Sequence, residues 1–129
     1  MIEKRFPQDK VAYTYNNVVK IGKSSGIGFP GEIVYKSEMD NFNVLKMEIE
    51  ILKPDLLLFF SGTSYDVRIR QKLGEYIAEP IKSFSENELC RLKFANDLPF
   101  AVRTFHPKAM YIKKLDKLHY FNSIIDAAF

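Results

Sequence analysis

Two short apolar runs, each bounded by residues that interrupt regular structure, are the clearest elements in the chain. The run at 55–61 (DLLLFFS) lies between Pro54 and Gly62, and the run at 99–105 (PFAVRTF) stops at His106. Unbroken apolarity over so few residues is typical of a strand that is covered on both faces, as in a parallel sheet. Both runs are therefore predicted to be buried strands.

Two further segments carry strand signals. The stretch 11–19 (VAYTYNNVV) is rich in aromatic and β-branched residues, which favour extended chain, and is predicted to be a strand. The segment 84–94 fits two patterns. Ser85 with Glu88 resembles the capping box of a helix, whereas alternate apolar residues further along indicate a strand: Cys90, Leu92 and Phe94. This segment is left open between helix and strand.

Helical periodicity occurs between and after the strands. The segment 39–53 is predicted to be one helix that Pro54 ends. Its apolar stripe consists of Phe42, Leu45, Ile49 and Leu52. The segments 65–73 and 117–129 are also predicted to be helices. The apolar face of the second comprises Leu118, Phe121, Ile124, Ile125 and Ala128.

Alternation of strands and helices predicts an α/β fold, in one domain over residues 1–129. The expected architecture is a three-layer α/β/α sandwich with a short, mostly parallel sheet. Ligands of such sheets bind at the carboxyl ends of the strands. The residues after positions 19, 60 and 105 are therefore expected at one edge, and His106 lies on that side.

Charge adds a local feature to this picture. The net charge is only +3, but five cations lie close together near the C-terminus with Asp116 as the only acid among them. They are Arg103, Lys108, Lys113, Lys114 and Lys117. A basic stretch of this kind attracts phosphate, although it also fits an ordinary solvated loop face.

The remaining composition restricts the class of protein. The single cysteine, Cys90, excludes an internal disulfide, fits a reducing cytoplasm, and is expected to fill the core rather than to act as a nucleophile. No apolar run approaches the roughly 18 residues of a membrane span, and the first ten residues lack the apolar core of a signal peptide. We therefore expect a cytoplasmic protein without a membrane partner.

Two motifs suggest chemistry. The glycine-rich segment 20–31 (KIGKSSGIGFPG) lacks the glycine spacing of a phosphate-binding loop, so a flexible connection is the better interpretation. Proline holds the preceding residue extended, so His106 should project from the end of its strand, where a neutral imidazole can donate a hydrogen bond to a developing oxyanion. A structural histidine bonded to a loop is the alternative. With His119 inside a helix pattern and no carboxylates at ligand spacing, neither a metal nor a cofactor is expected.

The sequences KPDLLLFFSGTSYD, RTFHPKAMYI and HYFNSIIDAAF, in this order, resemble the C-terminal half of the uracil-DNA glycosylase superfamily. Further upstream, YNNVVKIG resembles the family's second strand. The resemblance implies that His106 stabilises the uracil anion, that Asn16 reads the base edge, and that Met110 is the apolar wedge that replaces a flipped nucleotide. It also implies a set of DNA contacts: Ser61, Gly62, Ser64, Pro107 and Lys108. The basic stretch adds Lys113 and Lys114 as candidate DNA contacts.

The family's first motif, a glycine-rich loop that positions the attacking water, has no counterpart before Asn16. The chain is therefore expected to be incomplete at its N-terminus or to be a remnant without that half. Three functions stay open: a base-excision hydrolase acting on uracil-containing DNA, a noncatalytic nucleic-acid-binding protein that uses the basic stretch, or an interaction module whose homo-oligomer covers the missing strand.

Overall fold

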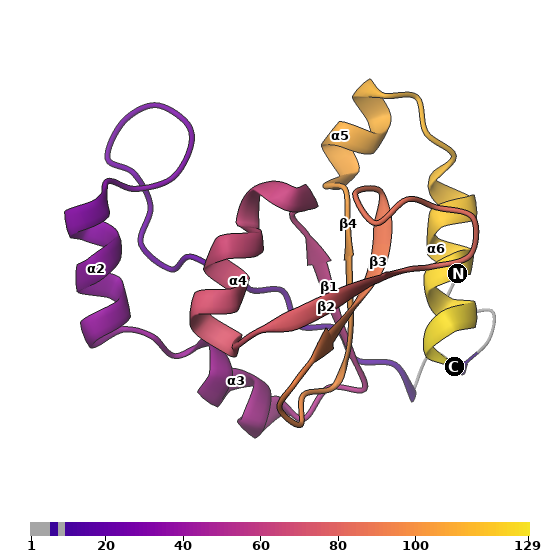
Figure 1. Ribbon diagram of the computed structural model, residues 1–129, viewed down its shortest axis with the longest axis horizontal. Helices are drawn as coiled ribbons and strands as arrows, with labels where there is room; N and C mark the ends of the chain where they lie inside the picture. Colours follow the sequence, from indigo (N-terminus) through magenta and orange to yellow (C-terminus); the bar gives the residue numbers. More distant parts are fainter. Residues whose placement is uncertain (1–5, 8–9) are drawn as a thin grey trace.

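The computed structural model describes residues 6–7 and 10–129, and its central feature is a four-stranded sheet (Figure 1). The strands are β1 (Leu56–Phe60), β2 (Tyr76–Pro80), β3 (Leu89–Phe94) and β4 (Phe100–Thr104). Their order across the sheet is β1-β4-β3-β2. The two apolar runs predicted to be strands are β1 and β4, and they lie side by side.

The sheet is mixed, so the prediction of a mostly parallel sheet is wrong. Only β1 and β4 run parallel, with Leu58 opposite Val102, whereas β3 is antiparallel to both β4 and β2. The reason is the length of the connections. Only residues 95–99 separate β3 from β4 and only residues 81–88 separate β2 from β3, and a parallel crossover needs about a dozen residues or more.

Helices cover both faces of the sheet. On one face, α3 (Leu45–Leu52) and α4 (Asp66–Leu73) pack through buried residues such as Ile49 and Ile69 against Phe59 of β1. On the other face, α6 (Lys117–Ala128) packs through Ile124 against Val102 of β4. Figure 1 shows α4 and α6 on opposite sides of the strands. Successive side chains of β1 point alternately to these two faces, and both faces are covered by helices. Every position of β1 is therefore apolar.

The described part of the chain contains three further elements. A 3₁₀ turn, η2 (Gly62–Tyr65), joins β1 to α4, and α5 (Pro107–Ile112) follows β4. A further helix, α2 (Glu32–Asn41), lies outside α4 in Figure 1, far from α6. The α/β class is therefore confirmed, and the helices predicted at 65–73 and 117–129 are confirmed as α4 and α6.

The helix predicted over 39–53 is two helices. Chain direction changes at residues 42–44, between α2 and α3, where Phe42 leaves the helical region with φ −136°. Asn41 ends α2 and Asn43 lies within the break, and asparagine is a weak helix former because its side chain competes for backbone hydrogen bonds. Asn41 Nδ2 does so here, donating to the Ser37 carbonyl at 2.9 Å. Half of the expected stripe is buried, Leu45 and Ile49, while Phe42 and Leu52 are exposed.

The other two segments with strand signals behave differently from each other. Residues 11–19 form no strand, and most of their side chains are exposed, so the strand predicted there is wrong. In segment 84–94 the structure contains both predicted features, the capping contacts of Ser85 with Glu88 and a strand. Glu88 Oε2 accepts from the Ser85 N–H and Oγ at 3.0 and 2.9 Å, but the capped turn leads directly into β3.

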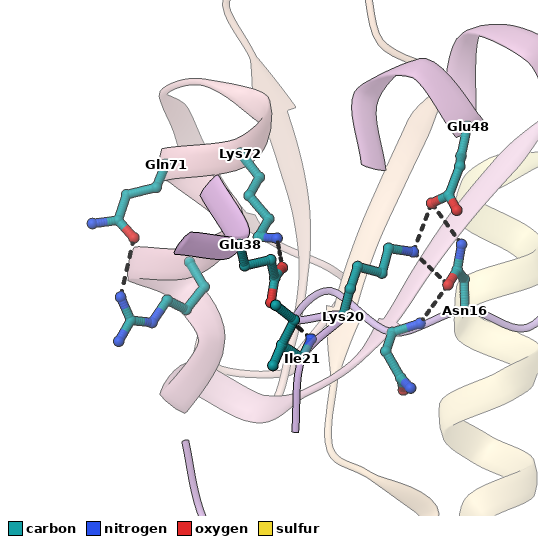
Figure 2. A network of polar contacts seen from close by, with 9 residues as sticks. Asn16, Lys20, Ile21, Glu38, Glu48, Gln71 and Lys72 are labelled. Carbon is teal, nitrogen blue, oxygen red and sulfur yellow. Dashed lines mark hydrogen bonds and ion pairs between the residues drawn. The ribbon is translucent and has the colours of Figure 1, made fainter. Parts of the chain in front are cut away.

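Helix α2 is held to the domain by polar contacts, as Figure 2 shows. The Glu38 carboxylate pairs with Lys72 of α4, both side chains being fully buried, and accepts the Ile21 N–H at 2.9 Å. The Arg68 guanidinium also lies 3.7 Å from the centre of the Tyr35 ring, a cation–π contact. Only Tyr35 and Glu38 of α2 are buried.

Candidate nucleic-acid interface

His106 occupies the predicted place at the carboxyl end of β4. It is the N-cap of α5, and its Nδ1 accepts a hydrogen bond from the Lys108 N–H at 3.1 Å. Pro107 follows at the first helical position, where a missing N–H costs nothing. Since Nδ1 is an acceptor, the neutral ring carries its proton on Nε2. That N–H makes no hydrogen bond with any described residue, and the side chain is exposed.

The turn after β1 lies beside His106, because β1 and β4 are parallel and in register. Phe60 pairs with Thr104, and the Ser61 N–H donates to the Thr104 carbonyl at 3.2 Å. Gly62 takes φ +58°, a left-handed conformation that glycine adopts without strain. Ser64 Oγ donates back to the Ser61 carbonyl at 3.1 Å and remains exposed. The predicted contacts at Ser61, Gly62 and Ser64 thus share one edge with His106.

Four of the five clustered cations are on the surface of α5, α6 and their connection. Lys108, Lys113, Lys114 and Lys117 are exposed. Asp116, the acid among them, accepts from the N–H groups of Leu118 and His119 and so caps α6. We call these four lysines, with the α5 residues between them, the α5–α6 corner. Figure 1 shows α5 projecting from one end of the molecule.

Arg103 is not part of that surface, which corrects the predicted basic stretch. Its side chain is buried under α4 and donates to Asp66 Oδ2 at 2.6 Å, to the Glu86 carbonyl at 2.5 Å and to Cys90 Sγ at 3.1 Å. Alternation along β4 turns Arg103 toward the α4 face. Burial raises the pKa of the Cys90 thiol, which stays protonated as expected of a core residue.

Met110 is likewise in the interior rather than at the surface where a DNA wedge would stand. It is fully buried between β4 and α6 in the cluster with Val102 and Ile124. The exposed apolar side chains of α5 are its neighbours Tyr111 and Ile112, 75% and 67% exposed. The cause is helical periodicity, which turns Met110 away from the face that Tyr111 and Ile112 share with Lys108. The resemblance alone did not indicate Tyr111.

Asn16 is not brought near His106. Its Nδ2 donates to Glu48 Oε2 at 2.6 Å, and its Oδ1 accepts from Lys20 at 2.5 Å (Figure 2). Glu48 belongs to α3, which precedes β1, and in Figure 1 α3 and α5 lie at opposite ends of the sheet. Hydrogen bonds from Lys20, opposed in part by burial, hold the pKa of Glu48 below its usual value, so Asn16 is bound to a carboxylate. The base site expected from Asn16 and His106 is therefore not assembled.

Two hollows on the described surface lie elsewhere. An open groove of about 490 Å³ is lined by Tyr35 and neighbours on α2 and α4, and a smaller one of about 140 Å³ lies at the β3–β4 turn. Neither includes a residue of the α5–α6 corner or of the turn after β1. What these residues present to a ligand is an exposed, positively charged surface.

Comparisons with protein-family models, curated proteins and solved structures found no match to this chain. Within the described ranges, no group of three or more His, Cys, Asp and Glu side chains is arranged to hold a metal ion. The helices of the described chain are all too short or too polar to cross a bilayer.

Proposed function

We propose that this protein binds nucleic acid noncatalytically through the α5–α6 corner. The observation that carries the proposal is four exposed lysines on α5, α6 and their connection, together with the exposed Tyr111. Asp116, the only acid within residues 103–117, caps α6. The exposed Nε2–H of His106 adds a hydrogen-bond donor at the same edge. Helices on both faces of the sheet support the three-layer α/β/α architecture expected from the alternation of strands and helices.

Phosphate contacts by lysine give a salt dependence whose size follows from their number. With four lysines, log affinity is expected to fall against log salt with a slope of about −3 for single strands and about −3.6 for duplex DNA. Affinity should then drop roughly 60- to 150-fold between about 50 and 200 mM salt.

The test is fluorescence anisotropy with a labelled oligonucleotide over a salt series. In the double variant Lys113→Glu, Lys114→Glu we expect affinity to fall at least about tenfold and the slope to shrink by about 1.5 or more. The matched control is Lys36→Glu, Lys46→Glu, which makes the same change of charge on exposed residues of α2 and α3. Equal losses in both variants would mean that only net charge matters, and the proposal would fail.

Glycosylase activity is the second candidate, and the free Nε2–H of His106 is the observation in its favour. The position of Asn16 weighs against it, because the residue expected to read the base edge is hydrogen-bonded to Glu48 of α3 instead of lying at that edge. Formation of abasic sites in uracil-containing DNA, lost in His106→Ala, would establish the enzyme in place of the noncatalytic protein.

A further inference from the structure

We infer that the ligand of the α5–α6 corner is single-stranded nucleic acid and that Tyr111 stacks on one of its bases; this inference rests on the proposed function. Proteins that bind single strands without sequence preference combine positive charge along the backbone path with aromatic rings on which bases stack. The corner supplies both parts.

The ring of Tyr111 faces solvent and is not packed into the core. It is 75% exposed to solvent. Lys108 precedes it by three positions on the same helical face, and Lys117 Nζ lies 5.6 Å from the ring centre. A base stacked on this ring therefore has two lysines nearby for the phosphates that flank it.

The exposure of Tyr111 depends on burial of its neighbour. Met110 anchors α5 in the core, the Leu115 N–H donates to the Met110 carbonyl at 2.9 Å, and Lys113 Nζ lies 5.4 Å from the centre of the Phe105 ring. These contacts fix the orientation of the short helix. Tyr111 and Ile112 thus point outward from a held backbone, as a stacking platform requires.

The side chains of α5 offer little for reading the bases of a duplex. The helix consists of Pro, Lys, Ala, Met, Tyr and Ile, and of the residue types that commonly read base edges in a groove it carries only Lys108. In a duplex the faces of the bases are already stacked on each other. A ring such as Tyr111 finds an open base face only in a single strand, where every base offers one.

The chain has no tryptophan, so Tyr111→Trp introduces a single fluorescent reporter at the proposed stacking position. We expect its emission to be quenched by oligo(dT) or oligo(U), and not by inorganic polyphosphate, which binds the same lysines without bases. Tyr111→Ala should weaken oligo(dT) binding by roughly 5- to 100-fold, and Tyr111→Phe should retain it. Tyr15→Ala is the control, because Tyr15 is 83% exposed beside Asn16, away from the corner.

Failure of this inference is distinguishable from failure of the proposed function. If Tyr111→Ala binds oligo(dT) like the wild type, or duplex DNA of equal length binds more tightly, stacking on single strands is wrong while binding through the lysines stands. If the wild type binds neither nucleic acid in low salt, the proposed function fails. Preferential binding of oligo(dT), lost in Tyr111→Ala and kept in Tyr15→Ala, supports both.

Discussion

Replacement of Glu38 by glutamine is expected to destabilise the protein, because this carboxylate anchors α2. Its Oε1 pairs with Lys72 of α4, and its Oε2 accepts the Ile21 N–H (Figure 2). One buried side chain therefore joins three segments that are distant in sequence. The remaining buried residue of α2, Tyr35, contributes a cation–π contact with Arg68.

The magnitude follows from what the substitution leaves behind. Removing one partner of a buried ion pair costs about 3–5 kcal/mol, because the other charge stays buried and unpaired. In Glu38→Gln the amide oxygen can still accept the Ile21 N–H, so we expect a loss near the lower end, about 3 kcal/mol. With a urea slope of about 2 kcal/mol per M, the unfolding midpoint should fall by roughly 1.5 M.

The pH dependence has a definite sign. Burial alone raises the pKa of Glu38, but hydrogen bonds from the Lys20 and Ile21 N–H groups and from Lys72 outweigh it and hold the pKa below its usual value. A depressed carboxyl pKa stabilises the fold above the unfolded pKa of about 4.3, and that contribution is lost as the pH falls through the folded pKa. The wild type should therefore lose stability in acid more steeply than Glu38→Gln, and the two should converge.

The assay is urea unfolding followed by far-ultraviolet circular dichroism at several pH values between about 2 and 7, so that the series passes below the folded pKa of Glu38. Glu75→Gln is the matched control. Its carboxylate pairs with Arg70 at 3.3 Å but is largely exposed, so a change below about 1 kcal/mol is expected. The double variant Glu38→Met, Lys72→Met removes both charges and should recover much of the loss. A Glu38→Gln midpoint equal to that of the wild type at neutral pH would refute the anchoring role.

Two further outcomes test the interior placement of residues that were expected at the surface. Met110→Ala should lower the free energy of unfolding by about 2–5 kcal/mol, because it leaves a cavity in the core beside α6. Thermal unfolding measures this loss, and an unchanged midpoint would mean that Met110 is exposed. Asp66→Asn should lower the free energy of unfolding, measured in urea, by about 2 kcal/mol, because the buried Arg103 guanidinium loses its charged acceptor. If Arg103 were exposed at the surface, stability would not change.

Elements with strong local boundaries were predictable from the residues alone. Between Pro54 and Gly62 the chain has no alternative to a short apolar strand, and β1 occupies that interval. The cap of α6 is also local, since Asp116 accepts from the two N–H groups that follow it in the first turn. In such cases short-range sterics and hydrogen bonding select the structure before any distant contact forms.

Prediction from the sequence failed where contacts with distant parts of the chain determine the secondary structure or its direction. The stretch 11–19 has strand-forming residues, yet no described strand pairs with it, and strand propensity is realised only through a neighbour. The direction of β3 depended on the short turn to β4 rather than on its composition. The break between α2 and α3 came from asparagines within an apparently continuous apolar stripe.

For the candidate interface, composition established that lysines gather after β4 and that a histidine ends this strand. Packing then decided where each residue lies. It placed Arg103 and Met110 inside and left Tyr111 and the lysines outside, while a hydrogen bond to Glu48 of α3 holds Asn16 at the far end of the sheet. The physical reason is that residue type and immediate neighbours determine which helices and strands form. The face of each element that becomes buried is determined by the surfaces against which it packs, and those surfaces come from remote parts of the chain.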